Sequence, residues 1–335
     1  MTRSPAHLAT SPSGTALRRP SWLDRSIASA LLLITPEYRN VRRQQRCNAR
    51  SRTPSLAQPP EMPFAWITVL GETIRIARQP RPGSPTLLLL CPLPQSILAF
   101  APIWPALAER FDLVAVDLPG FGRSSGGIAW MTFAAQGRFL KACIEQLGLR
   151  RPHIVAPDVG MAAAVACVGE NPGMAASLVI GDGPAIAPSS NGSIIRKLVH
   201  SGFWRFMVTL ADAGTFVEAA NRLAYVQYTP NAQEVDDYIR SYAGRVGPIC
   251  RWFRDYPTSL VSTDAQLAGL DLPVQLFWGR HDALLDVENA GRLLQRLPRA
   301  RLEILENAGH YSYQDAAADF TALLIRWVER EHQQI

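Results

Sequence analysis

From residue 62 onward, apolar positions alternate between strand and helix patterns. Two short runs, 65–70 and 72–77, flank Gly71 and predict a hairpin, and the run 86–91 predicts a strand buried on both faces. Further strands, separated by amphipathic helical patterns, are predicted at 113–117, 153–156 and 177–182. This alternation predicts an α/β fold with a doubly wound, mostly parallel sheet and helices on both faces.

The pattern changes after Asp182. Helical periodicity with many aromatic residues continues to about residue 267, and strand patterns resume at 273–279 and 301–306. We therefore expect a core of residues 62–183 and 268–335, with residues 184–267 as a helical lid inserted after the sixth strand. Such an insertion covers the crevice at the carboxyl ends of the strands, where open α/β sheets bind ligands.

Residues 1–61 are rich in Ser, Pro and Arg and have little apolar periodicity, which predicts a disordered leader whose removal leaves folding and activity intact. The first 60 residues hold ten Arg against two acidic residues, so the folded part is near neutral and no nucleic-acid surface is expected on it. Arg18, Arg19 and Arg25 precede the apolar run Ile27–Ile34, which loosely resembles an export signal. We favour a non-functional leader and a cytoplasmic protein, with export as the alternative.

The composition sets aside several classes of protein. No apolar run in the sequence reaches the ~20 residues of a membrane-spanning helix. Five scattered cysteines without a Cys-x-x-Cys pair predict neither a disulfide framework nor a zinc site. We expect no metal, nucleotide or flavin cofactor, because no ligand cluster or phosphate-binding glycine loop is present. The sequence carries no signal for an oligomeric state.

One acidic residue stands where a strand breaks into a helix of small residues, in the stretch "HIVAPDVGMAAAVA" (153–166). Ala156 and Gly160 flank Asp158 at the spacing of a nucleophile elbow, a sharp turn that exposes its central side chain. The elbow predicts that Asp158 is a nucleophile. A helix N-cap is the alternative, because Asp also favours that position.

With Asp158 in the elbow, the chain from about 63 to 332 resembles the α/β-hydrolase family, and within it the epoxide hydrolase and haloalkane dehalogenase branch. The segments "DLPGFGRSS" (117–125), "WGRHD" (278–282) and "NAGHYSYQD" (307–315) carry this resemblance. It implies a triad in the order nucleophile, acid, histidine: Asp158, Asp282 and His310. The alternatives are a turn residue for Asp282 and a surface loop for His310.

The resemblance also implies that Asp158 forms an alkyl ester, which His310, oriented by Asp282, hydrolyses by removing a proton from water. Backbone amides of Leu93 and Val159 are the expected oxyanion donors. The family pattern His-Gly-x-Pro is replaced here by Cys91-Pro92-Leu93-Pro94, in which Pro92 has no N–H.

This chain lacks the leaving-group donors that haloalkane dehalogenases and epoxide hydrolases use. Haloalkane dehalogenases hold the halide with a Trp and an Asn where this chain has Val159 and Leu93, and epoxide hydrolases use a lid Tyr where it has Phe253. Other candidate proton donors in the lid, each also explicable as packing, are Tyr225, Tyr228, Tyr238, Tyr242 and His200. Phe203, Trp204 and Phe206 predict an apolar pocket or the core of the lid itself.

We therefore expect an epoxide hydrolase-like enzyme that uses water to hydrolyse a small apolar molecule through an Asp158 ester. The alternatives are a haloalkane dehalogenase, an esterase-like hydrolase, and a non-catalytic homologue that binds a ligand.

Overall fold

The computed structural model describes residues 16–33, 35–51, 56–184 and 193–332. An eight-stranded sheet forms its centre, with the spatial order β1-β2-β4-β3-β5-β6-β7-β8. The strands are β1 (Phe64–Val69), β2 (Glu72–Gln79), β3 (Thr86–Leu90), β4 (Asp112–Val116), β5 (His153–Pro157), β6 (Ser177–Gly181), β7 (Val274–Gly279) and β8 (Ala300–Leu305).

The predicted hairpin forms the antiparallel edge of this sheet, with Val69 paired to Glu72 across the turn at Gly71. From β3 to β8 the strands are parallel, and β3, β5 and β6 are almost wholly buried. Continuous Leu, Val and Ile runs suit strands that are covered on both faces. The predicted doubly wound, mostly parallel fold is thereby confirmed.

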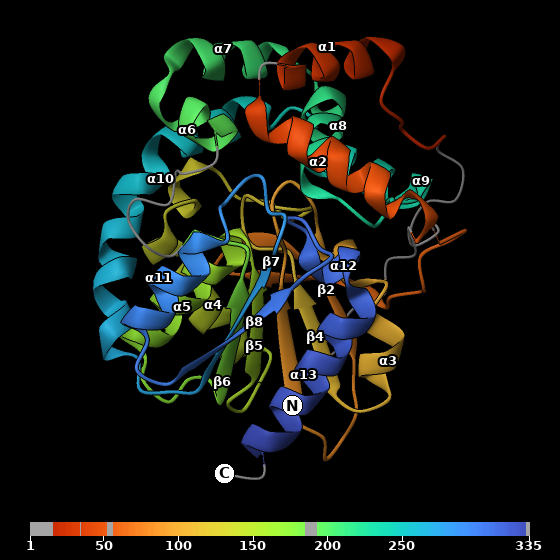
Figure 1. The fold of residues 1–335 in the computed structure, drawn as a ribbon. Helices are drawn as coiled ribbons and strands as arrows, with labels where there is room; N and C mark the ends of the chain where they lie inside the picture. The colour runs from red at the N-terminus through yellow and green to blue at the C-terminus, as the bar shows by residue number, and fades with distance from the viewer. Residues whose placement is uncertain (1–15, 34, 52–55, 185–192, 333–335) are drawn as a thin grey trace.

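Helices cover both faces of the sheet (Figure 1). On one face lie α4 (Phe133–Gln146), α5 (Val159–Glu170) and α11 (Glu288–Arg296). The other face carries α3 (Trp104–Ala108) and α13 (Ala317–His332), with the short α12 (Ser312–Asp315) at the upper end of α13.

The helical insertion lies between β6 and β7, as predicted, and sits over the carboxyl ends of the strands (Figure 1). It consists of α6 (Ser193–His200), α7 (Gly202–Leu210), α8 (Ala213–Ala224), α9 (Ala232–Tyr242) and α10 (Val246–Gln266). Residues 185–192, which were predicted to begin the lid, lie outside the described residues.

Buried charges join this insertion to the core. The Arg75 guanidinium donates to Asp117 at 2.7 Å and, through its two other nitrogens, to both carboxylate oxygens of Asp237 on α9. All three side chains are largely shielded from solvent. This cluster ties α9 to β2 and to the end of β4, and removal of one partner would leave a buried charge uncompensated.

The prediction of a disordered leader is wrong for much of its length. Two helices, α1 (Trp22–Leu33) and α2 (Pro36–Cys47), pack against α8, whereas residues 1–15, 34 and 52–55 lie outside the described residues. The Thr215 hydroxyl donates to Asp24 at 2.8 Å, and the Arg222 guanidinium donates to the Ser29 hydroxyl at 2.7 Å. The leader is ordered because it buries Ala28, Leu32 and Val41 against the insertion, which local periodicity alone does not reveal.

Candidate active site

Asp158 stands at the turn between β5 and α5, with φ 49° and ψ −128°. This left-handed conformation is costly for a residue with a side chain and is held here by close packing. A Cβ on Gly160 would lie 3.0 Å from Leu90 Cβ, and one on Gly183 would lie 2.3 Å from the Asp158 carbonyl oxygen. The Asp158 side chain makes no cap bond to α5, so the N-cap alternative does not describe it.

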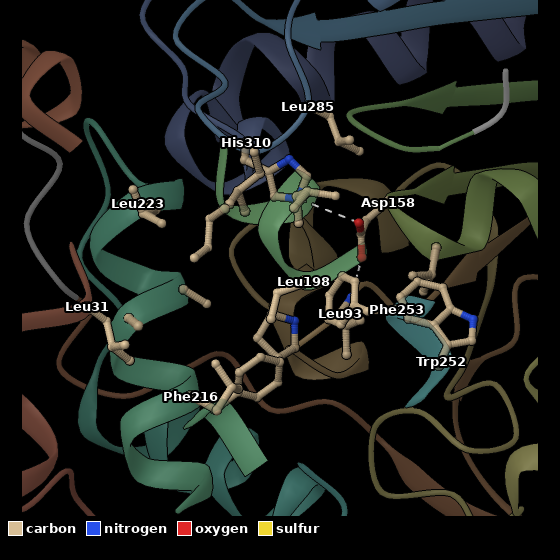
Figure 2. Close-up of a pocket in the computed structure, with 18 of the residues that line it drawn as sticks. Leu31, Leu93, Asp158, Leu198, Phe216, Leu223, Trp252, Phe253, Leu285 and His310 are labelled. Carbon is tan, nitrogen blue, oxygen red and sulfur yellow. Dashed lines mark hydrogen bonds and ion pairs between the residues drawn. The ribbon is translucent and has the colours of Figure 1, made fainter. Parts of the chain in front are cut away.

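Two groups face the Asp158 carboxylate, which is 7% exposed (Figure 2). The Leu93 amide donates to Oδ2 at 2.6 Å, and Nε2 of His310 lies 3.5 Å from Oδ1. The two oxygens are therefore distinguished, because Oδ2 is held by the backbone and Oδ1 faces the imidazole.

The predicted oxyanion donors differ in their contacts. Leu93 meets the carboxylate as expected, through the amide that precedes the cis peptide bond to Pro94. Val159 lines the same cavity at the first position of α5, but among the described residues its amide makes no hydrogen bond to the carboxylate. The structure thus brings one of the two expected donors into contact with Asp158.

His310 connects Asp158 to Asp282. Its Nδ1 lies 2.9 Å from Asp282 Oδ2, while the other oxygen of Asp282 accepts the amides of Leu284 and Leu285. His310 is only 2% exposed, so the surface-loop alternative is wrong. Asp282 combines both expected roles, since it closes a turn with one oxygen and contacts the imidazole with the other.

The surroundings of His310 favour its charged form. Burial by itself lowers the pKa of the imidazole, but the charges of Asp282 and Asp158 outweigh burial and hold this pKa well above its ordinary value. A protonated His310 places its charge 3.5 Å from Oδ1 of Asp158.

A second acid, Asp182, was missed in the sequence analysis. It follows β6, accepts the Gly279 amide at 2.8 Å and accepts a hydrogen bond from the Ser312 hydroxyl. Burial, and then the charge of Asp282, raises the pKa of Asp182 well above its ordinary value. Asp182 thereby ties the end of β6 to β7 and to the segment after His310. Its sequence signal was an acidic residue closing an otherwise apolar strand.

Asp158 and His310 open into an apolar cavity between the sheet and the insertion (Figure 2). Of the described residues, no Lys or Arg lines it. The Thr215 hydroxyl and the Trp252 indole N–H donate elsewhere, to Asp24 and to the Met131 carbonyl. The apolar walls include Leu93, Val159, Leu198, Val208, Phe216, Leu223, Phe253, Leu284 and Leu285.

The predicted proton donors do not line this cavity. The hydroxyls of Tyr225, Tyr228 and Tyr242 bond instead to Gln314, Glu234 and the Gln95 carbonyl, respectively. Tyr238 is fully buried outside the cavity wall, and His200 is exposed at the end of α6. The structure therefore places none of these five side chains on the cavity wall, and three of the tyrosine hydroxyls are held in polar contacts elsewhere.

Tyr256 of α10 lines the cavity instead. It lies three residues after Phe253, so both side chains share one face of the helix. This spacing was the sequence signal that could have found it.

Residues of the leader also reach the cavity. Leu31 and Leu32 of α1 line it opposite Asp158 (Figure 2 labels Leu31). The amide side chains of Gln45 and Asn48 hold the segment that follows α1 by donating to the carbonyls of Tyr225 and Val226. The cavity wall is therefore built from three parts of the chain: the core, the insertion and the leader.

Comparison with known proteins gives relatives of low identity. The chain is 24% identical over 238 residues to a 2-hydroxy-6-oxononadienedioate/2-hydroxy-6-oxononatrienedioate hydrolase of Pseudomonas putida, covering 67% of this chain and 79% of that protein. It is 22% identical over 253 residues to an uncharacterized hydrolase of Bacillus subtilis, covering 74% of this chain and 91% of that protein. The curated relatives therefore include hydrolases.

Solved structures agree on the fold. Haloalkane dehalogenase DbeA of Bradyrhizobium elkani superimposes with a TM-score of 0.70 at 23% identity, covering 82% of this chain and 100% of that one. At this identity the similarity concerns the fold alone. The family model for the alpha/beta hydrolase fold matches residues 85–317, which include Asp158, Asp282 and His310. This chain belongs to the α/β-hydrolase fold family.

Proposed function

We propose that this protein hydrolyses a small apolar molecule through an ester on Asp158, and that its substrate is an epoxide. The observation that carries the proposal is the position of Asp158, whose two oxygens face the Leu93 amide and His310 at the end of an apolar cavity. In this proposal, residues 184–267 are a lid over the core of residues 62–183 and 268–335.

In the first step, Oδ1 of Asp158 attacks a carbon of the epoxide. The ring C–O bond breaks, its electron pair moves to the ring oxygen, and a proton from the Tyr256 hydroxyl neutralises that oxygen. Tyr256 supports this step because it is a phenol on a cavity wall that is otherwise mostly apolar. The tyrosinate regains a proton at the end of the second step.

In the second step, Nε2 of His310 removes a proton from water, and the hydroxide attacks the carboxyl carbon of Asp158. Negative charge develops on Oδ2, where the Leu93 amide donates. Collapse of this intermediate breaks the bond to the substrate oxygen, and His310 returns the proton to the departing alcohol. Asp158 is left as a carboxylic acid, and its proton passes through solvent to the Tyr256 tyrosinate. The products are a diol, the free Asp158 carboxylate and a neutral Tyr256.

The state of His310 supports this order of steps. The Asp158 charge is one of the causes that raise the pKa of His310, and ester formation removes that charge. The imidazole then loses a proton more easily, so a base appears only after the ester exists.

The cavity wall disfavours two other substrate classes. A departing halide would need N–H donors, and the Trp252 indole already donates to the Met131 carbonyl at 2.9 Å. The Pseudomonas putida relative is named for a dioate substrate, whereas no Lys or Arg side chain of the described residues lines this cavity to bind carboxylates. An apolar substrate with a neutral oxygen leaving group fits best.

The test is trapping of the ester. Purified protein is first assayed against epoxides, haloalkanes and aryl esters, and His310→Gln is then incubated with the best substrate. Intact-protein mass spectrometry should show one added substrate mass on the peptide that contains Asp158, and Asp158→Ala should show none.

Single turnover in heavy-oxygen water provides a second readout. Hydrolysis of the ester at its carboxyl carbon places the label in Asp158 on the first turnover and in product only later. Full labelling of product on the first turnover would show direct attack by water and would overturn the ester mechanism. Turnover of haloalkanes or aryl esters but not epoxides would overturn the substrate class, and no turnover in the whole panel would favour a ligand-binding homologue.

A further inference from the structure

An apolar stripe on α7 faces away from the protein. Phe203, Phe206, Met207 and Leu210 are 66%, 59%, 39% and 66% exposed, respectively. Their spacing of three, four and seven residues is the pattern by which a helix normally covers a core. The aromatic spacing predicts Phe203 and Phe206 in a pocket or in the core of the lid, and the structure contradicts both. On the opposite side of α7, Val208 lines the cavity.

Helix α1 shows the same arrangement. Trp22 and Leu33 are 74% and 79% exposed and Leu23 is half exposed, while Leu32 on the other side lines the cavity. Both helices therefore border one cavity with their inner sides and lie at the end of the molecule farthest from the lower edge of the sheet (Figure 1).

The exposed apolar side chains are concentrated in these two segments. Nine of the fourteen large apolar side chains that are exposed among the described residues belong to residues 17–33 or to α7. We call six of them the apical apolar face: Trp22, Leu23, Leu33, Phe203, Phe206 and Leu210. This concentration at one end of the molecule indicates an interaction surface, because exposed apolar residues of a monomer are normally scattered singly.

Basic residues outnumber acidic ones in the two segments that carry this face. Exposed arginines of the leader include Arg18, Arg19, Arg25, Arg39, Arg42 and Arg43. Residues 193–212, which include α6 and α7, hold three basic residues, Arg196, Lys197 and Arg205, and one acidic residue, Asp212. In the described leader the two acids are Asp24, which accepts from Ser21 and Thr215, and Glu37.

We propose that the apical apolar face docks on the surface of a membrane that contains anionic lipids. Short helices with apolar side chains outward and basic residues at their sides bind in the interfacial plane, where apolar groups enter the acyl boundary and arginines meet lipid phosphates. No helix of the described residues is long and apolar enough to cross a membrane, so docking is peripheral. A second copy on the same face is disfavoured, because it would bring two sets of arginines together.

The test measures binding of the full chain to vesicles and needs no turnover, so its result is independent of the proposed chemistry. The protein is sedimented with vesicles of phosphatidylcholine alone or with about a third of phosphatidylglycerol, at low and high salt. We expect binding to the anionic vesicles, weakened by salt, and little binding to the neutral ones.

Two pairs of variants distinguish binding through the apical apolar face from nonspecific binding to vesicles. Phe203→Ser/Phe206→Ser should weaken binding at least about tenfold, because two apolar anchors no longer leave water. Its control, Val261→Ser/Leu294→Ser, changes exposed apolar residues of α10 and α11 and should bind like the wild type. Arg19→Gln/Arg25→Gln should also weaken binding about tenfold or more. Arg150→Gln/Arg301→Gln, at the amino ends of β5 and β8, should not.

Thermal unfolding of each variant confirms that these surface changes leave the fold intact. The proposal is overturned if the wild type fails to bind anionic vesicles, or if the Phe203/Phe206 variant binds them as well as the wild type does. A concentration-dependent dimer in analytical ultracentrifugation, abolished in the Phe203/Phe206 variant and accompanied by no vesicle binding, would overturn it in favour of a second copy.

Discussion

The backbone amide of Leu93 donates a 2.6 Å hydrogen bond to Oδ2 of Asp158, across 65 positions of sequence. This bond fixes the carboxylate with its other oxygen toward His310. The loop after β3 thus positions the candidate nucleophile and also supplies a donor for charge that develops on the same oxygen.

Asp158→Asn should separate these two roles. The amide oxygen of Asn still accepts from Leu93, so we expect little change in melting temperature. A neutral amide is a poor nucleophile, so turnover should fall by at least about a thousandfold. The comparison of melting temperature with turnover checks this, and a variant that keeps most of its turnover would exclude Asp158 as nucleophile.

The proton donor is tested by Tyr256→Phe. We expect a loss of about a hundredfold or more in epoxide opening, the range found for a general acid. Tyr228→Phe is the matched control, because its hydroxyl bonds to Glu234 outside the cavity. Equal rates for Tyr256→Phe and the wild type would place the acid elsewhere.

The two chemical steps should differ in pH dependence. Burial lowers the pKa of His310, but the charges of Asp282 and Asp158 raise it well above its ordinary value, and the Asp158 charge is lost in the ester. Hydrolysis needs neutral His310, so its rate should fall as pH drops through the pKa of His310 in the ester. Ester formation does not use His310 as a base and should not share this decline. Single-turnover kinetics from pH 5 to 9 measure both steps, and identical profiles would argue against the mechanism.

Leu32 and Leu33 test the packing of the leader. Leu32 is 1% exposed and lines the cavity, whereas Leu33 points outward. Leu32→Ala should cost about 2 kcal/mol or more of folding free energy and change the preferred substrate size, while Leu33→Ala should stay within about 0.5 kcal/mol. A chain that begins at Met62 should unfold at a lower temperature than the full chain. Unchanged melting in both the truncated chain and Leu32→Ala would mean that α1 contributes no stability.

Glu234 should make stability depend on pH. Burial raises the pKa of its carboxyl from 4.5 to about 7, although Asn231, Tyr228 and Gln314 donate to it. Because the folded state prefers the neutral acid, this contribution is complete below pH 4.5 and is lost as pH rises through 7, a change of roughly 3 kcal/mol.

Glu234→Gln removes this titration, so its stability relative to the wild type should rise by roughly 3 kcal/mol between pH 4.5 and 8. Urea unfolding at the two pH values measures the difference. Glu329→Gln, at an exposed ion pair with Arg110, should show no such change. A pH-independent difference for Glu234→Gln would show that the pKa of Glu234 is the same in the folded and unfolded protein.

The sequence by itself determined the order of strands and helices and the position of the elbow. Buried parallel strands need continuous apolar runs, so the local pattern alone predicts the strands at 86–91 and 153–156. A sharp strand-to-helix turn needs small neighbours, so the local pattern also predicts the elbow around Asp158. The order of Asp158, Asp282 and His310 was also readable, because each follows the end of a predicted strand, and the carboxyl ends of parallel strands meet at one edge.

Only the tertiary structure decided which side chains face the cavity. Five tyrosines of the insertion have similar local sequence patterns: Tyr225, Tyr228, Tyr238, Tyr242 and Tyr256. Only Tyr256 of these lines the cavity, because α8, α9 and α10 pack differently on distant parts of the chain. The order of the leader likewise depends on contacts between distant parts of the chain. Its helices gain stability from the apolar surface they bury against α8, which lies about 180 residues away in sequence, and a contact between distant segments leaves no periodic signal in either one.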